Sequence, residues 1–541
     1  MNSFLNAIIP LSPVLLVIMP VIGACFGWGA SRLGLEFNRW TAFSNSLVSC
    51  LILGSVMFAP FLQNDEDDRP TRAISVTLKL PASETASAEE TSAQVFRWVL
   101  DSTSAWFLLL PTCMWPVLTL FMNRIIAVSQ GHYILLMLLQ ALLAGLFVAS
   151  DLISFITFLM LTTFCLLCLI RLASGPRSRS VFESTMYLQF LGDGLIMGGL
   201  LLAATGYTWM QGVLLEGPQP LTLQFEPILQ GTASDVALYP VAEMYWSTIS
   251  PWIFLLLLTG FVIKGALFPA HYQLTQWLKL LPAHPGPTPE GIGWYLVLLT
   301  LITKASIYGM IRFMIPLNFT VGASLFSLLA LWGSFGFLMA ALIACLKKDL
   351  LQIVVWFLIG QSSLALTILF ATDSTAVSQY LLWNLVQGLA CCLLFLVVPL
   401  IAFETQTRTH KLFMGIAGLS ILTLIGVPGL GGFTAGFALL WSLAHQSIWL
   451  ALSFLLGSLL FNLALIRSFW QLMKRDQPAG LPAASETPVR SHEHMSLAWL
   501  AFSPVVLLIL VLGVSPATLL EQTLLPLIPI KASATEAPAE D

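Results

Sequence analysis

Charged residues are scarce in this sequence: only 9% of its 541 residues are Asp, Glu, Lys or Arg. Hydrophobic residues make up 57% of the chain, and the mean hydropathy is +0.87. Apolar runs of about twenty residues recur from end to end, and each is long enough to cross a bilayer. This composition excludes a soluble domain and predicts an all-α polytopic membrane protein.

Signatures of redox centres and nucleotides are also missing. The sequence has no Gly-rich nucleotide fingerprint and no haem-type pairing of residues, and its eight cysteines form no cluster. Cys165 and Cys168 make a CxxC motif, but within a Leu-rich span and without a second pair, which favours helix packing. We therefore expect no cofactor, no metal, no nucleic-acid partner and no catalytic site; any catalysis would belong to another chain.

The apolar runs predict about fourteen spans between residues 8 and 520. Loops after odd-numbered spans are basic, and loops after even-numbered spans are neutral or acidic. Arg171, Arg177 and Arg179 follow the fifth span, for example, whereas the stretch 65–68 (DEDD) follows the second. By the positive-inside rule, this alternation predicts a multi-pass protein of the cell (inner) membrane with both termini on the outer side.

Three segments are predicted to lie outside the membrane. Residues 64–97 form an acidic external loop with a short strand at 74–80. Residues 206–250 form a second external loop, whose length favours a structured cap or a partner contact. The tail, KASATEAPAED, is small and acidic, and we expect it to be disordered.

Two neighbouring spans, 251–274 and 291–315, each carry one lysine near the middle, Lys264 and Lys304. A charged side chain at the bilayer centre is costly, so such residues usually face the protein interior or a water-filled path. An ordinary lysine reaching out to the interface is the alternative. Pro269 lacks an N–H and is predicted to break the helix just past Lys264. A lysine beside a broken helix favours an ion path, with both lysines facing a shared polar interior.

A second break is predicted in the twelfth span, at GVPGLGGF, which contains Gly426, Pro428 and Gly429. Broken helices at matching places in two five-helix halves point to an inverted-repeat transporter. The predicted parts are N-terminal helices over 1–131, a first repeat over 132–315, a second over 316–475, and a C-terminal helix with the acidic tail over 476–541.

Together these segments resemble the antiporter-like membrane subunits shared by respiratory complex I, membrane-bound hydrogenases and Mrp-type cation/proton antiporters. VIKGALFPAH, LITKASIYGMIRF, KKDLLQIVVW and GVPGLGGFTAGF stand in family order, between Asp101 and about Trp470. The resemblance implies fourteen helices and two inverted repeats, each a half-channel for protons. It also implies a pump lysine on the seventh helix, matched by Lys264, a modulating glutamate on the fifth, and a relay residue on the eighth, matched by Lys304.

The sequence departs from the family at other positions. Gln140 stands where we place the modulating glutamate, and an amide supplies no negative charge to Lys264. In the second half, apolar or amide residues replace the family's titratable ones: Leu351, Gln361, Gln387 and Gly436. We therefore predict that the second half does not conduct protons in the family manner.

The first half adds an unexpected acid, Asp193, flanked by Gly192 and Gly194. It is either the partner of Lys264 or the cap of a distorted helix. His271 follows the Pro269 break and either reaches water or forms a structural hydrogen bond. Asp101 and Asp151 lie at span ends, where helix caps or interface positions are expected. The candidate ion path comprises Lys264, Lys304, Asp193, His271 and Gln140.

Three functions are compatible with these residues. The first is a subunit that moves protons or monovalent cations through Lys264 and Lys304 within a larger complex. The second resembles the membrane partner in Dab-type inorganic carbon uptake, driven by the proton-motive force. The third is a structural subunit that conducts nothing. The retained lysines argue against the third, and the glutamines argue against a complete complex I pump.

Overall fold

The computed structural model describes residues 9–34, 38–62, 74–79, 95–125, 129–173, 179–278, 292–317, 319, 323–371, 374–403, 408–475 and 495–514. In chain order, its elements are η1 (Ile9–Leu11), α2 (Ser12–Arg32), α3 (Asn38–Leu62), β1 (Ile74–Lys79), β2 (Val95–Leu100), α4 (Ser102–Ile125), α5 (Gln130–Val148), α6 (Leu152–Ala173), α7 (Arg179–Leu214), α8 (Phe225–Leu238), α9 (Pro240–Lys264), α10 (Tyr272–Leu278), α11 (Ile292–Gly309), η3 (Met310–Met314), α12 (Ala323–Leu346), α13 (Leu350–Ala371), α14 (Ser374–Phe403), α15 (Arg408–Ile425), α16 (Gly431–Gln446), α17 (Ile448–Arg475) and α18 (Met495–Val514).

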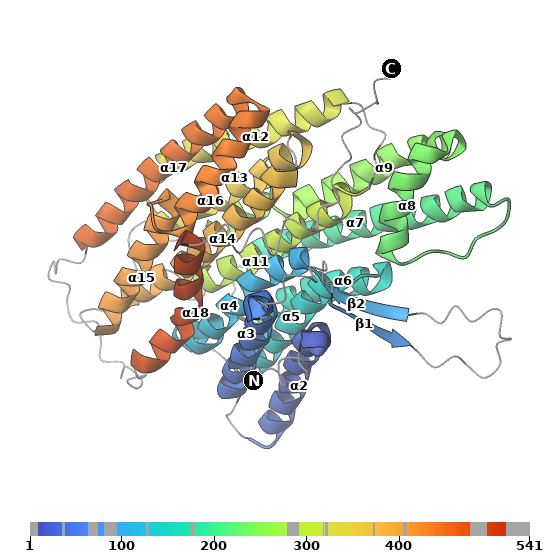
Figure 1. The fold of residues 1–541 in the computed structure, drawn as a ribbon. Helices are drawn as coiled ribbons and strands as arrows, with labels where there is room; N and C mark the ends of the chain where they lie inside the picture. Colours follow the sequence, from blue (N-terminus) through green and yellow to red (C-terminus); the bar gives the residue numbers. More distant parts are fainter. Residues whose placement is uncertain are drawn as a thin grey trace.

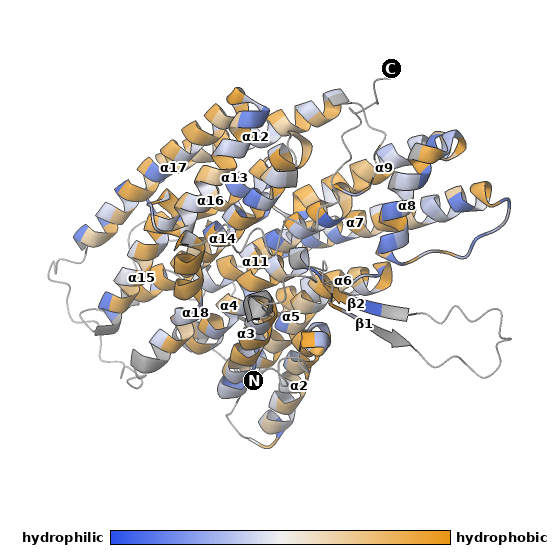
Figure 2. Ribbon diagram, viewed as in Figure 1, coloured by the Kyte–Doolittle hydropathy of each residue, from blue (hydrophilic) through white to orange (hydrophobic). Residues whose placement is uncertain are grey.

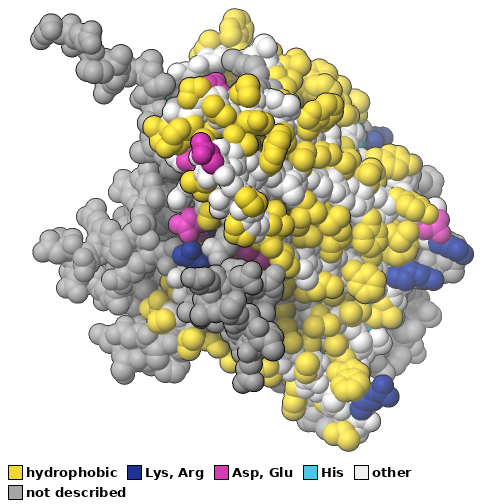
Figure 3. Space-filling view, turned by 90° about the vertical axis from the view of Figure 1, so that its right-hand side faces the viewer, with side chains coloured by type: hydrophobic (Ala, Val, Ile, Leu, Met, Phe, Trp, Pro, Cys, Tyr) yellow, Lys and Arg dark blue, Asp and Glu magenta, His cyan; other side chains and the backbone are white. Residues whose placement is uncertain are grey.

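The prediction of an all-α polytopic membrane protein is confirmed. Among the described residues, twelve helices are long and apolar enough to cross a membrane. Two shorter apolar helices, His410–Ile425 and Trp499–Val514, lie at the predicted twelfth and fourteenth spans. Hydrophobic residues extend along most of the helices in Figure 2. On the face shown in Figure 3, hydrophobic side chains cover most of the described surface and charged ones are few, as a lipid environment requires.

Both predicted helix breaks are present. The seventh span divides into α9 and α10, and the twelfth divides into α15 and α16. A side-chain amide satisfies carbonyls left free at each break. Gln273 Nε2 donates to the carbonyls of Ile263 and Lys264 at 3.0 and 3.1 Å, and Asn462 Nδ2 donates to that of Ile425 at 3.1 Å. In the second break, Gly429 has a φ of +92°, which only glycine adopts without strain.

The part between the sixth and seventh spans differs from the prediction. The predicted loop 206–250 is mostly helical, because α7 continues to Leu214, α8 follows, and α9 begins at Pro240. The 36 residues of α7 span about 54 Å, well beyond a hydrocarbon core of about 30 Å. Polar residues in these extensions lower the hydropathy but do not end the helices, so a hydropathy criterion places the boundaries too early.

The predicted strand at 74–80 is confirmed as β1, but its partner was missed. β1 pairs antiparallel with β2, with Ile74 opposite Leu100 and Lys79 opposite Val95. The β2 sequence, VFRWVL, is apolar and directly precedes a span, so periodicity alone does not separate it from the helix. The rest of the segment 64–97 and the acidic tail lie outside the described residues.

The two halves of the chain lie on opposite sides of a central layer. In Figure 1, α11 and α14 lie between α7, α8 and α9 on one side and α12, α13, α16 and α17 on the other. α14 also packs against α4, α13, α15 and α16. The lysine of α11 therefore lies where the two halves meet, whereas the lysine of α9 lies within the first half.

Candidate functional site

Lys264 ends α9 inside the protein, and only 1% of it is exposed. Its ammonium group forms an ion pair with Asp193 of α7, whose exposed fraction is 0%. The same Nζ donates to Thr163 Oγ1 of α6 at 2.8 Å and to Gln189 Oε1 of α7 at 3.3 Å. Of the two interpretations of Asp193, the structure therefore supports the first: Asp193 is the partner of Lys264. Side chains from two helices, α6 and α7, thus hold the ammonium group at the end of α9.

Small residues let α7 and α9 approach closely enough to form the pair. A Cβ atom added at Gly192 would lie 3.2 Å from the carbonyl oxygen of Gly260 and 3.3 Å from the Cβ of Lys264. One added at Gly260 would lie 2.7 Å from the side chain of Ile196. Glycines on both helices thus remove the bulk that would hold Asp193 away from Lys264, as is common between membrane helices.

A polar row on α7 leads from this pair toward one end of the helix. Thr185, Gln189 and Asp193 recur every four residues and are fully buried. Gln189 donates to Gln273 of α10 at 2.8 Å, and Trp277 of α10 donates to Thr185 at 3.2 Å. Beyond Asp193, the buried face of α7 continues with Ile196, Gly199, Leu200, Ala203 and Ala204. On the buried face of α7, the polar groups thus lie between the pair and the end of the helix that begins at Arg179.

Lys304 of α11 is 2% exposed and has a separate set of partners. Its ammonium group donates to Gln361 Oε1 of α13 at 2.6 Å and to Asn384 Oδ1 of α14 at 2.7 Å. Both lysines thus face the protein interior, as predicted, but each binds its own cluster rather than one shared set of groups. The partners of Lys304 are neutral and come from the second half of the chain.

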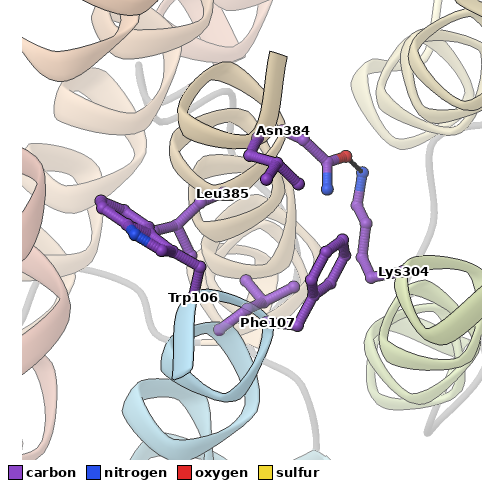
Figure 4. Close-up of a pocket in the computed structure, with 7 residues that line it drawn as sticks. Trp106, Phe107, Lys304, Asn384 and Leu385 are labelled. Atoms are coloured by element: carbon purple, nitrogen blue, oxygen red, sulfur yellow. Dashed lines mark hydrogen bonds between the residues drawn. The ribbon is translucent and has the colours of Figure 1, made fainter. Parts of the chain in front are cut away.

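A small cavity lies beside Lys304. Its lining residues come from α4, α11 and α14, and Figure 4 shows Trp106, Phe107, Lys304, Asn384 and Leu385 around the cavity. The cavity has a volume of about 10 Å³, close to the smallest space that holds one water molecule. Asn384 and Lys304 supply the polar groups that such a water would bind.

The other two residues of the candidate path form no hydrogen bond with either lysine in the part of the chain that the structure describes. Gln140 of α5 is 4% exposed, and neither atom of its amide has a hydrogen-bond partner. Lys264 donates to Thr163 of α6 and forms no hydrogen bond with Gln140 of α5. His271 is half-buried; its ring stacks on Phe268, with centroids 5.3 Å apart, and lies 5.1 Å from the ring of Trp356. Its packing is that of a structural aromatic.

Three partners of the lysines were missed in the sequence: Thr163, Gln189 and Asn384. Polar residues of this kind are common in membrane helices. The sequences of the two lysine-bearing spans do not show which polar residues of other helices face a lysine. The spacing of Gln189 from Asp193 was the available signal, because residues four apart share one side of a helix. Thr163 and Asn384 required the three-dimensional arrangement.

The two acids at span ends are helix caps, as expected. Asp101 Oδ1 accepts from the N–H of Ser104 at 2.8 Å at the start of α4, and Asp151 Oδ1 accepts from that of Ser154 at 2.7 Å at the start of α6. Asp101 also forms an ion pair with Arg312 in the π-helical turn η3. This second role was not predicted.

Together, the fold and the sequence motifs are those of an antiporter-like membrane subunit. The family model for the transmembrane region of NADH:quinone oxidoreductase and Mrp antiporters matches residues 149–461, more than half of the chain. The chain belongs to this family. The resemblance inferred from its motifs is therefore confirmed.

Curated relatives are similar over most of their length. NADH-quinone oxidoreductase subunit 13 of Thermus thermophilus is 28% identical over 389 residues, which cover 69% of this chain and 75% of that protein. NADH-quinone oxidoreductase subunit M of Rhodobacter capsulatus is 23% identical over 447 residues, or 77% of this chain and 78% of that protein.

Solved structures share the fold at low sequence identity. A chain of the archaeal membrane-bound sulfane sulfur reductase has a TM-score of 0.72 at 16% identity and covers 95% of this chain and 97% of its own. A chain of the Mrp complex from Dietzia sp. DQ12-45-1b has a TM-score of 0.70 at 15% identity, covering 95% and 96%. One of respiratory complex I from Thermus thermophilus has a TM-score of 0.68 at 22% identity, covering 95% and 98%.

Proposed function

We propose that this chain moves protons or monovalent cations across the membrane as one subunit of a larger complex. The observation that carries the proposal is the buried ion pair between Lys264 and Asp193, at the end of a broken helix. An ammonium group at this depth is costly, and groups of this kind in membrane spans mark ion paths and proton relays. The relatives named above are subunits of quinone-reducing complexes, which supports a role within an assembly.

The inlet of the path is the polar row on α7 and α10. Thr185, Gln189 and Gln273 provide buried hydroxyl and amide groups from the Arg179 end of α7 up to Lys264. With basic loops inside, this end faces the inner side of the membrane, and both termini lie outside. Asp193 compensates the charge of Lys264 in the resting state, in place of the family glutamate.

Lys304 receives the charge next. It shares α11 with Ser306, whose hydroxyl donates to the carbonyl of Phe261 on α9 at 2.7 Å, so the two lysine-bearing helices pack directly. Its neutral partners, Gln361 and Asn384, can accept hydrogen bonds but cannot take up a proton at neutral pH. The second half therefore holds Lys304 in position without continuing the relay.

The experiment compares two variants in membrane vesicles that contain the assembled complex. Lys264→Ala is expected to abolish proton or cation flux, because it removes the titratable group at the centre of the inlet. Gln387→Ala, at a buried amide of the second half, is expected to change flux much less. Equal loss in both variants would contradict flux through the first half alone. Normal flux in Lys264→Ala would favour a non-conducting structural subunit.

The partner is tested separately by purifying the complex in mild detergent and identifying the co-purifying chains. Hydrophilic quinone-reducing subunits would assign the chain to a respiratory complex. A zinc-bearing, carbonic-anhydrase-like chain would assign it to inorganic carbon uptake instead.

A further inference from the structure

The backbone at the break between α9 and α10 is bound by side chains of the second half of the chain. Phe268 lies outside both helices, because α9 ends at Lys264 and α10 begins at Tyr272. The N–H of Phe268 donates to Ser363 Oγ of α13 at 2.9 Å, and its carbonyl accepts from Trp332 Nε1 of α12 at 3.0 Å. Backbone groups at membrane depth need partners within the protein. Ser363 and Trp332 therefore supply hydrogen bonds that a continuous helix would have provided.

α12 and α13 also pack closely around this part of the break. The ring of Phe268 lies 6.0 Å from that of Phe335 on α12, measured between centroids. A Cβ atom added at Gly336 of α12 would lie 3.1 Å from the Cβ of Phe268 and 2.9 Å from that of Ser363. Gly336 thus leaves the room in which α12, α13 and the break meet.

The backbone between Lys264 and Phe268 is buried and contains a strained residue. Ala266 and Leu267 are both 0% exposed. Ala266 has a φ of +52°, in the left-handed region that residues with a Cβ atom rarely adopt. Such a conformation persists only where the surrounding structure imposes it, and such residues cluster at functional sites. The fixed position of Phe268 is one such constraint, and it lies four residues from Lys264.

The helix that follows the break contacts both the backbone of Lys264 and a partner of its ammonium group. Gln273 of α10 donates to the carbonyl of Lys264 at 3.1 Å. Gln273 Oε1 accepts from Gln189 Nε2 at 2.8 Å, and Gln189 Oε1 accepts from Lys264 Nζ at 3.3 Å. Hydrogen bonds and short stretches of backbone thus connect Ser363 and Trp332 with the buried ammonium group.

We propose that Ser363 and Trp332 are positioning residues of the ion path. By holding Phe268 from the second half of the chain, they fix where Lys264 lies against Asp193. This inference rests on the proposed function. It gives the second half, whose amides replace the family's titratable residues, a part in flux that requires no proton transfer. Loss of either bond lets the break and α10 shift, and the contacts around the ammonium group lengthen with them.

Two variants test the two bonds separately in vesicles that contain the assembled complex. Ser363→Ala removes the acceptor of the Phe268 N–H. Trp332→Phe removes the donor to the Phe268 carbonyl and keeps an aromatic ring. Each is expected to lower flux per assembled complex at least about tenfold, because a displacement of about 1 Å at a reacting group can cost about a hundredfold in rate.

Ser420→Ala and Trp499→Phe are the matched controls. Ser420 and Ser363 are both fully buried, and each hydroxyl donates at 2.8 Å to the carbonyl four residues earlier in its own helix. Ser363 differs because it also accepts from the Phe268 N–H. Trp499 on α18 is 52% exposed, similar to the 44% of Trp332. Flux in both controls is expected to stay near that of the unmodified protein.

Two local readouts separate positioning from a general loss of stability. Hydrogen exchange in the peptide 262–274 is expected to be about tenfold faster in Ser363→Ala, the factor that corresponds to one lost hydrogen bond of ordinary net strength. The infrared carboxylate band of Asp193, identified by its absence in Asp193→Asn, is expected to shift in Ser363→Ala and in Trp332→Phe but not in the controls. Lower flux with an unchanged Asp193 band would overturn the proposal, because the two residues would then act elsewhere.

Lys264→Ala, measured in the same vesicles, separates failure of this proposal from failure of the proposed function. If Lys264→Ala loses flux while Ser363→Ala and Trp332→Phe conduct normally, the path stands and the positioning role is wrong. Equal loss in these two variants and their controls would also overturn it. If Lys264→Ala conducts normally, the proposed function itself is wrong. Trp332 lies at the surface, so Trp332→Phe keeps the test decisive if Ser363→Ala does not assemble.

Discussion

Replacing Asp193 by Asn is expected to reduce stability and flux together. The substitution keeps the shape of the side chain, so the close packing of α7 on α9 is retained, but it leaves the ammonium group of Lys264 without a countercharge. Removing one partner of a buried pair typically costs about 3–5 kcal/mol. Thr163 and Gln189 still accept hydrogen bonds from Lys264. We therefore expect the lower end of that range, about 3 kcal/mol.

The double variant Asp193→Asn/Lys264→Met isolates the pair. Because neither charge is then left unpaired, most of the lost stability is expected to return, with an interaction energy of about 2 kcal/mol in the double-mutant cycle. Flux stays lost, since Met cannot hold a proton. Reversible unfolding in mixed micelles gives the free energies of unfolding, and vesicle flux gives the activity. If the effects of the two single substitutions on the free energy of unfolding add to that of the double variant within about 0.5 kcal/mol, the reasoning is refuted.

Three further changes test the surroundings of the lysines. Thr163→Val removes one acceptor from Lys264 without changing shape, and should lower stability by about 1–3 kcal/mol in the same unfolding assay. Gln273→Leu removes the donor to the carbonyls of Ile263 and Lys264 and interrupts the inlet; we expect flux to fall at least severalfold while the complex still assembles on size exclusion. Asn384→Leu leaves Lys304 with Gln361 alone, and its flux should fall more than that of an exposed substitution such as Tyr187→Phe.

The span count and the two helix breaks could be predicted because they depend on local chemistry. Apolar runs of bilayer length are unambiguous, and Pro269 and the glycines around Pro428 favour a break, although other prolines such as Pro251 and Pro399 lie within continuous helices. The burial of Lys264 and Lys304 followed from the cost of exposing an ammonium group to lipid. Neither conclusion needs tertiary structure.

The partners of the lysines could be predicted only in part. Asp193 was a candidate because an acid within an apolar span demands a countercharge, and Gly192 beside it permits close helix packing. Gln140 was assigned from the order of the helices, but it lies on α5, and the hydrogen bond of Lys264 goes to Thr163 of α6. Which polar residue of a helix faces a given lysine depends on how that helix is rotated about its axis. This rotation cannot be read from a single sequence.

The contacts of Asp101, Ser104 and Tyr308 were missed for a different reason. Asp101 was interpreted as a cap, and it is one, but its second carboxylate oxygen pairs with Arg312, which follows it by 211 residues. Tyr308 and Ser104 look like ordinary packing residues in their spans. Contacts between α4, α5 and α11 bring their hydroxyls to the same carbonyl, that of Phe147, and those contacts exist only after the chain has folded.

The most direct test of the central claim is proton flux in oriented vesicles for two lysine variants of the same chemistry. Lys264→Met removes the buried ammonium group, and Lys474→Met removes an exposed one, whose Nζ lies 5.4 Å from the ring of Trp470. Flux through the first half predicts that Lys264→Met conducts at background level while Lys474→Met conducts like the unmodified protein. Equal flux in the two variants, with both complexes assembled, would contradict the claim.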